Sequence, residues 1–308
     1  MRIRATVAAV TGALALSAFA VPAAQADGSA PSRADVAKVL DAAHAASGKT
    51  GARIAAAAED EPYALDAGFS NMKINGGKAI VAGTSKQVTV PATFTLTHAA
   101  DVDVTAADFV VDVAIYKGSY AEPDNFLIGD DYPVCTPVTA TTASCKGAID
   151  IYPDVELLNS DAGTWKAAAF AIAFNGQDPE ADDFDVTKVG VVEKGDLGTT
   201  KLQRYSKLTV NASPEPVKKG KTITVTGALT RANWETHKYA GYTNQPVKLQ
   251  FKKKGTTTYV NVKTVTSTST GALKTTVTAA TDGYFRYNFA GTTTTPAAKA
   301  AGDFVDVQ

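Results

Sequence analysis

The densest group of side chains that could bind a metal ion is an acidic run in the middle of the chain. Five carboxylates fall within eight residues, at Asp178, Glu180, Asp182, Asp183 and Asp185. Calcium takes about six to eight oxygen ligands, so closely spaced carboxylates in a loop suit it. The run is not an EF-hand, because Asp183 stands where that loop needs glycine and Val189 stands where it needs glutamate. We therefore expect either a non-EF calcium site or a solvated acidic loop.

A second candidate site combines aromatic rings with basic groups in the segment 231–244, which is long for a loop between two strands. Its members are Arg231, Trp234, His237, Lys238, Tyr239 and Tyr242. Aromatic rings can stack on sugars, and the cations can meet the charges of a cell-wall polymer. The alternative is a loop that folds back over the edge of its own β-sandwich.

The common signatures of catalysis are incomplete. Two Gly-Lys-Thr tripeptides, at 48–50 and 220–222, lack the glycine that a phosphate-binding loop needs five residues earlier. The sequence contains neither Gly-x-Ser-x-Gly nor His-Glu-x-x-His, and its three histidines lie in separate segments, at His44, His98 and His237. We expect a protein that is not an enzyme. A carboxylate-based hydrolase, the weakest alternative, needs two carboxylates about 5 to 9.5 Å apart across a cleft.

Cys135 and Cys145 are the only cysteines. In an exported protein such a pair predicts a disulfide, here one that closes a hairpin. The nine intervening residues differ from the Cys-x-x-Cys spacing of a redox site.

Charge divides the chain into two halves of opposite sign. Residues 27–206 hold 14 basic and 26 acidic side chains, a net charge of −12, whereas residues 207–308 hold 14 and 5, a net charge of +9. Such a basic half could meet an anionic partner, such as a wall polymer, or dock on the acidic half. The alternative is two surfaces whose charges serve solubility alone.

The sequence of the basic half predicts one complete β-sandwich. In Thr222–Gly227, Ile223 and Val225 alternate with threonines, the period of a strand with one buried face. Six further short strands are predicted, at 207–212, 247–251, 259–265, 273–277, 284–289 and 303–307. Seven short strands in about a hundred residues are typical of an immunoglobulin-like domain.

Several of these strands resemble a bacterial immunoglobulin-like domain. The resemblance lies in Thr222–Gly227, Val247–Phe251, Tyr259–Val265, Gly271 and Gly283–Tyr287, the last similar to that group's Gly-Tyr-x-Arg strand. From about Ala67 onward, the chain also resembles uncharacterised secreted actinobacterial proteins that carry such a domain at the C-terminus, some of them loosely labelled calcium-binding. The resemblance implies the fold and leaves the ligand open.

Within the acidic half, residues 61–206 predict a second sandwich. Its most apolar runs, Phe109–Tyr116 and Trp165–Phe174, are expected to be central strands, although the alanines of the second run also suit a helix. Other predicted strands span 69–74, 88–97, 186–192 and 201–205.

The N-terminus predicts export. Met1–Ala26 has the basic start, apolar core and Ala24-Gln25-Ala26 cleavage site of a signal peptide, so we expect a mature protein from Asp27. Residues 27–60 are alanine-rich. They predict a helical tether whose first turn is capped by Ser32 and Asp35, with His44 on its surface. No later apolar run is long enough to span a bilayer.

Together these features predict an all-β protein of two tandem immunoglobulin-like sandwiches, following a signal peptide (1–26) and a helical tether (27–60). The domains are 61–206 and 207–308. We expect a secreted, extracellular, non-catalytic protein that binds a surface or an extracellular partner, such as an anionic cell-envelope polymer. We expect no nucleic-acid partner, and no cofactor other than the calcium of the alternative hypothesis.

Overall fold

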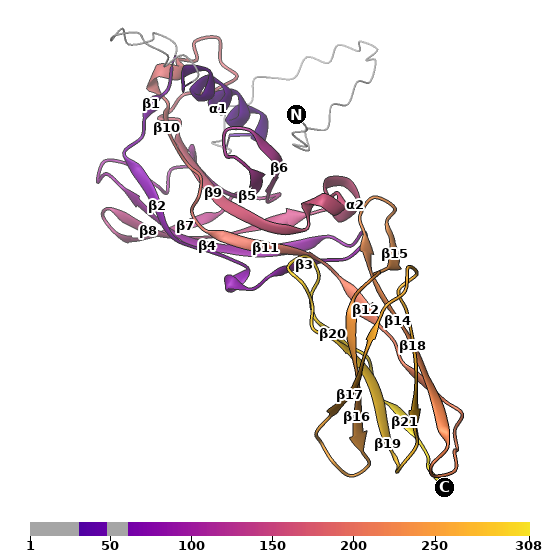
Figure 1. Cartoon of the computed structure of the whole chain (residues 1–308). Helices are drawn as coiled ribbons and strands as arrows, with labels where there is room; N and C mark the ends of the chain where they lie inside the picture. Colours follow the sequence, from indigo (N-terminus) through magenta and orange to yellow (C-terminus); the bar gives the residue numbers. More distant parts are fainter. Residues whose placement is uncertain (1–30, 48–60) are drawn as a thin grey trace, which may run out of the picture. The chain divides into compact units, whose positions relative to one another are not determined.

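The computed structural model describes residues 31–47 and 61–308 (Figure 1), so the predicted signal peptide lies outside the described residues. Strands dominate, which confirms the predicted all-β class. The described chain forms two compact units. The first comprises residues 31–47, 61–78, 89–151 and 165–200, and the second comprises 79–88, 152–164 and 201–308. Each unit is described separately below.

Two sheets build the first unit. One has the strand order β2 (Ala67–Ile74), β4 (Val88–His98), β8 (Thr142–Ile151) and β7 (Val134–Thr139). The other places β10 (Gly190–Lys194), β9 (Gly163–Ala173), β5 (Phe109–Gly118) and β6 (Pro123–Ile128) side by side. A short β1 (Tyr63–Ala64) pairs in parallel with β10. Lettered in chain order from β2 to β10 without β3, these strands form the sheets ABED and GFCC′, the immunoglobulin arrangement.

The central pair β5 and β9 is buried on both of its faces. On the inner face, Val111, Val113 and Ile115 lie opposite alanines of β9, because Val113 pairs with Ala169 and Ile115 with Ala167. Small residues opposite large branched ones suit a close-packed interior, and the alanine-rich run forms the expected strand rather than a helix. The outer face carries Val110, Asp112, Ala114 and Tyr116, which are also buried.

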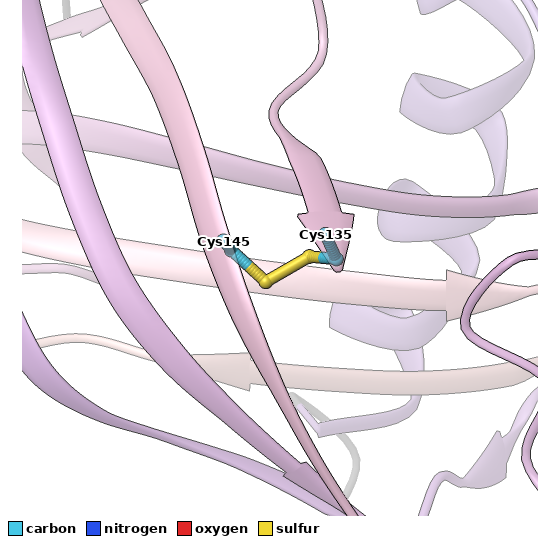
Figure 2. The surroundings of a disulfide bond; sticks show 2 residues. All are labelled: Cys135 and Cys145. Carbon is cyan, nitrogen blue, oxygen red and sulfur yellow. A yellow bond between two sulfur atoms is a disulfide. The ribbon is translucent and has the colours of Figure 1, made fainter. Parts of the chain in front are cut away.

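A disulfide joins Cys135 of β7 to Cys145 of β8, as predicted (Figure 2). The two residues are direct partners in the antiparallel ladder, with their Cα atoms 4.0 Å apart. The bridge therefore fastens neighbouring strands of one sheet. It holds β7, an edge strand whose Val134 and Val138 are exposed, against the body of the sandwich.

Replacing both Cys135 and Cys145 with alanine should lower the free energy of unfolding by about 2–3 kcal/mol, since the bridge closes a short loop in the unfolded chain. Denaturant unfolding followed by tryptophan fluorescence measures this. Reducing the wild-type protein should produce the same change, and an unchanged midpoint would contradict the expectation.

The helix α1 (Arg33–Ser47) packs on the outer face of the first unit's GFCC′ sheet (Figure 1). Val36 and Val39 are buried against a cluster that includes Val110, Phe170 and Ile172. The predicted cap is present: Ser32 N–H donates to Asp35 Oδ2 (3.2 Å), and Asp35 N–H donates to Ser32 Oγ (3.2 Å). The Ser32 hydroxyl also holds the pKa of Asp35 below its usual value.

Asp112 lies beneath α1 with no exposed side-chain surface, and Arg33 forms an ion pair and hydrogen bond with its carboxylate. Burial raises the pKa of Asp112 to about 6, against the opposite effects of Arg33 and of the Val113 N–H. In the unfolded chain the same group has its ordinary pKa of 3.8. Its contribution to stability is therefore complete below about pH 4 and is lost as the pH rises through 6.

Asp112→Asn should remove this pH dependence. The free energy of unfolding of the wild type, relative to that of the variant, should fall by about 2 kcal/mol between pH 4 and pH 7. Denaturant unfolding at half-unit pH steps tests this. Asp131→Asn, at an exposed site in the nearby loop, should follow the wild-type profile; a parallel profile for Asp112→Asn would refute the assignment.

The second unit is also a two-sheet sandwich. In one sheet, β14 (Thr222–Asn233) pairs with β13 (Asn211–Ser213), β18 (Ala272–Thr278), β12 (Ser206–Leu208) and β15 (Lys238–Gly241). The other sheet contains β17 (Val260–Thr266), β16 (Pro246–Lys253), β19 (Gly283–Phe289), β20 (Ala298–Lys299) and β21 (Asp303–Val305). Counting β13 as A and β21 as G gives the sheets ABE and C′CFG, again immunoglobulin-like.

The alternation predicted for β14 is confirmed, because Ile223 and Val225 are fully buried. They belong to one core with Leu249, Tyr287 and Phe289 of the facing sheet. The Tyr287 hydroxyl donates to the Val225 carbonyl oxygen (2.9 Å), which ties the two sheets together and satisfies the one polar group of that ring.

Two segments from the predicted first domain, 79–88 and 152–164, belong to the second unit by their contacts. The first contains β3 (Ile80–Ala82), which pairs in parallel with β11 (Thr199–Arg204). The second contains α2 (Pro153–Glu156) and the 3₁₀ turn η2 (Asn159–Asp161). Two other 3₁₀ turns, η1 (Asn75–Gly77) and η3 (Val186–Lys188), complete the structure. Within residues 31–47 and 61–308, no helix is long and apolar enough to cross a membrane.

Candidate binding face

The outer face of the C′CFG sheet in the second unit gathers aromatic and basic side chains. Cross-strand pairing places Lys252 opposite Tyr284 and places Tyr284 opposite Phe304. We call this surface the aromatic–basic face and define it by Lys252, Lys254, Tyr259, Tyr284, Arg286 and Phe304. All six side chains are half-buried or exposed, whereas the alternate residues of β19 point into the core.

Cations and rings lie in direct contact along this face. The Arg286 guanidinium stacks 3.6 Å above the centroid of the Tyr259 ring. Lys252 Nζ lies 4.5 Å from the ring centroid of Tyr284 and 5.3 Å from that of Tyr259. The Tyr284 and Phe304 rings follow at 5.2 Å, and Lys254 Nζ is 5.3 Å from the Phe304 ring. Each cation–ring pair contributes about 0.5–1 kcal/mol at an exposed site. Together these pairs hold the long side chains in place.

Hydrogen bonds fix the arginine across three strands. Arg286 Nε donates to Gln250 Oε1 (2.9 Å), and Gln250 Nε2 donates to Asn261 Oδ1 (2.9 Å). Gln250 is buried in the middle of this chain of bonds. The guanidinium is therefore oriented by the bond from its Nε to the buried Gln250 amide and by the Tyr259 ring on one side. This orientation reduces the entropy lost when the guanidinium binds a ligand.

Gly302 lets Tyr259 lie along the sheet. A Cβ at that position would collide with the Tyr259 hydroxyl, so any larger residue would displace the ring that supports Arg286. Glycine is needed here for the close approach of a side chain, rather than for an unusual backbone angle.

This arrangement suits binding rather than catalysis. Half-buried aromatic rings can still accept the C–H surface of a sugar, and an oriented guanidinium with a nearby lysine binds carboxylate or phosphate. Of the nearby carboxylates, Asp282 pairs with Lys254 of the face itself (3.2 Å), and Asp303 accepts from the Ala212 N–H (2.6 Å). The positive character of the face therefore comes from Lys252 and Arg286.

The sequence-predicted aromatic segment is a hairpin formed by β14 and β15, and its largest rings are structural. Trp234 is 1% exposed, and its Nε1–H donates to the Gly83 carbonyl oxygen (2.7 Å). Tyr242 is also buried, beneath the guanidinium of Arg231 at 3.9 Å. Arg231 in turn donates to Thr295 Oγ1 (3.3 Å).

The other residues of that segment lie nearer the surface. His237 occupies the turn with a positive φ of 55°, and Lys238 is exposed. Tyr239 lies under Lys207 Nζ at 3.5 Å. The structure therefore separates the six candidates into three supporting residues, Arg231, Trp234 and Tyr242, and three nearer the surface. It does not assemble them into one site.

The acidic run connects β9 to β10 and forms local turns. Asp178 Oδ1 accepts from the Glu180 N–H (2.9 Å), and Asp185 Oδ1 accepts from the Thr187 hydroxyl (2.6 Å). The Thr187 hydroxyl lowers the pKa of Asp185, which also pairs with Lys188 (3.3 Å). Among the described residues, no three His, Cys, Asp or Glu side chains are placed to hold one metal ion.

Because these carboxylates are engaged in local turns or spread in solvent, we expect calcium to leave thermal stability unchanged. A thermal melt of the protein with millimolar calcium, then with magnesium and then with chelator tests this, since a ligand that binds only the native state raises the Tm. A rise of several degrees with calcium alone would restore the calcium hypothesis. Loss of that rise in Asp182→Asn/Asp183→Asn would place the site in this run.

The three histidines have different neighbours in the structure. His44 Nε2 lies 2.9 Å from Glu193 Oε2, at the surface of the first unit. His98 Nδ1 lies 2.9 Å from the Ala99 carbonyl oxygen. His237 is in the β14–β15 turn of the second unit.

Comparisons with known proteins find matches among solved structures alone. No family model matches the chain, and no curated protein matches its sequence. Among solved structures, the mouse nectin-like molecule 4 ectodomain is 12% identical with a TM-score of 0.23, over 77% of this chain and 65% of that one. The Escherichia coli adhesin FdeC is 18% identical with a TM-score of 0.23, over 80% and 65%. The Yersinia pseudotuberculosis adhesin InvE is 14% identical with a TM-score of 0.21, over 73% and 54%. The chain thus spans about two thirds of the first of these.

Proposed function

We propose that the protein is a secreted, non-catalytic binding protein whose basic C-terminal domain holds an anionic, sugar-containing polymer of the cell envelope. The aromatic–basic face carries this proposal. It presents oriented cations and ring faces on a domain with a net charge of +9. The predicted signal peptide and the disulfide support a location outside the cell.

The chemistry of the face favours a polymer over a small ligand. A flat sheet face gives no enclosed pocket, so affinity must come from several weak contacts along an extended molecule. Sugar rings supply the apolar surface for Tyr259 and Tyr284, and repeated acidic groups meet Lys252 and Arg286. Such binding should weaken as salt rises, because solvent-exposed charges are screened.

The test measures binding of the full chain to immobilised polygalacturonate, with neutral dextran as the control polymer. We expect binding to polygalacturonate only, and weaker binding as sodium chloride rises from about 50 to about 300 mM. The double variant Lys252→Ala/Arg286→Ala should weaken binding about tenfold or more, since each charge-assisted contact is worth about 1.5–3 kcal/mol.

A matched control removes the same charge elsewhere on the domain. Lys238 of β15 and Lys274 of β18 are exposed on the opposite sheet. The variant Lys238→Ala/Lys274→Ala should bind nearly as the wild type does. Equal losses in the two double variants would show that net charge, rather than the aromatic–basic face, drives binding. Equal binding to dextran would exclude an anionic ligand. Calcium binding by the acidic run is the alternative function, tested by the melting experiment above.

A further inference from the structure

A second surface, in the first unit, has the properties of a helix-binding site. The outer face of the GFCC′ sheet bears buried apolar side chains that α1 covers, namely Val110, Phe170, Ile172, Phe174 and Val189. We call this surface the α1-covered face. In Figure 1, α1 lies beside β10, β5 and β6. Laying an amphipathic helix in an apolar surface is a recurring mode of protein recognition.

Carboxylates at two points of this face meet basic side chains of the helix, Arg33 and His44. Arg33 pairs with buried Asp112, donates to the Gly129 carbonyl oxygen (2.9 Å) and stacks on the Tyr132 ring at 4.2 Å. His44, eleven residues later, contacts Glu193 at 2.9 Å. That spacing is about three helical turns. The face therefore suits a helix with a hydrogen-bond donor near each end, a cation at the Asp112 end, and aliphatic residues between them.

The helix satisfies this face incompletely. Among the described residues, three buried side-chain polar atoms have no hydrogen-bond partner, and two of them, Tyr132 Oη and Glu193 Oε1, lie here. The other Glu193 oxygen, Oε2, accepts from the Tyr120 hydroxyl (3.0 Å). A buried polar atom without a partner costs about 1–3 kcal/mol, so a helix that supplied the missing groups would bind more tightly than α1 does.

The hold of α1 on the sheet is also small. Among the helix side chains that the structure describes, Val36 and Val39 are nearly fully buried, Leu40 packs against the same cluster while half-buried, and much of the rest is alanine. Its covalent connection to the sandwich is the segment 48–60. A tethered helix competes with a free one as though present at about millimolar concentration. A better-matched helix can therefore displace it.

We propose that the α1-covered face binds a cationic amphipathic helix of a partner protein, and that α1 occupies this site until the partner displaces it. The partner helix would carry an arginine for Asp112, aliphatic residues three and six positions later, and a lysine or arginine for Glu193 in place of His44. The charge of the face argues for this partner, because removal of the helix takes the Arg33 counter-charge away from Asp112.

The experiment titrates a fluorescent peptide of residues 31–47 into the full chain and follows fluorescence anisotropy. Arg33→Glu in the protein repels Asp112 and releases the tethered helix. Lys38→Glu changes the charge of the same helix equally at an exposed position. We expect the peptide to bind the Arg33→Glu protein about tenfold or more tightly than it binds the wild type or the Lys38→Glu protein.

Two peptide variants make the test specific. Arg33→Glu in the peptide should abolish binding, since the peptide then repels Asp112. His44→Arg in the peptide should strengthen binding severalfold, because a permanent cation with several donors can reach the unpaired Glu193 oxygen.

Three results would overturn the proposal. The first is equal peptide affinity for all three proteins, and the second is no binding to the Arg33→Glu protein at millimolar peptide. The third is a concentration-dependent dimer of the wild type that Arg33→Glu abolishes and Lys38→Glu retains, measured by sedimentation, which would assign the face to α1 of a second copy.

Discussion

A sheet has two faces, and in a sandwich the other sheet can bury only one of them. The rest of this structure depends on how each unit treats the remaining face of its C–F strand pair. In the first unit that face is apolar and includes Asp112, so it requires the α1 helix and the arginine that α1 delivers. In the second unit the same face carries lysine, arginine and tyrosine, whose long side chains cover one another and still reach water.

The two units therefore cover the same strand arrangement in different ways. The apolar face of the first unit is buried by a helix, and such a surface suits the recognition of helices. The face of the second unit is covered by its own side chains, and such a surface suits an extended polymer. Charge follows the same division, since the carboxylates under α1 call for cations and the lysines of the second unit call for anions. Within each unit, specificity resides in side chains supported by a rigid sheet.

Local patterns predicted most of the fold. Alternation in Thr222–Gly227, the apolar run Phe109–Tyr116 and the cysteine spacing each depend on neighbours in sequence, and the structure confirms them. The aromatic–basic face was missed because Tyr259, Arg286 and Gly302 are far apart in the chain and meet only through strand pairing and loop packing. The Trp234 segment appeared to be a site because sequence cannot show that Gly83 supplies a buried acceptor for its indole.

The chain crosses between its two units several times, because residues 79–88 and 152–164 belong with the C-terminal strands. The second unit is thus assembled from three separate stretches. Trp234 depends on Gly83 for its indole bond and on the Asn159 side chain for a backbone bond (3.0 Å). A C-terminal fragment cut at residue 207 would contain all of the basic domain's charge but would lack these acceptors. The second unit consequently cannot be transferred as one continuous segment. Its boundary is defined by contacts among three stretches of the chain rather than by a single cut in the sequence.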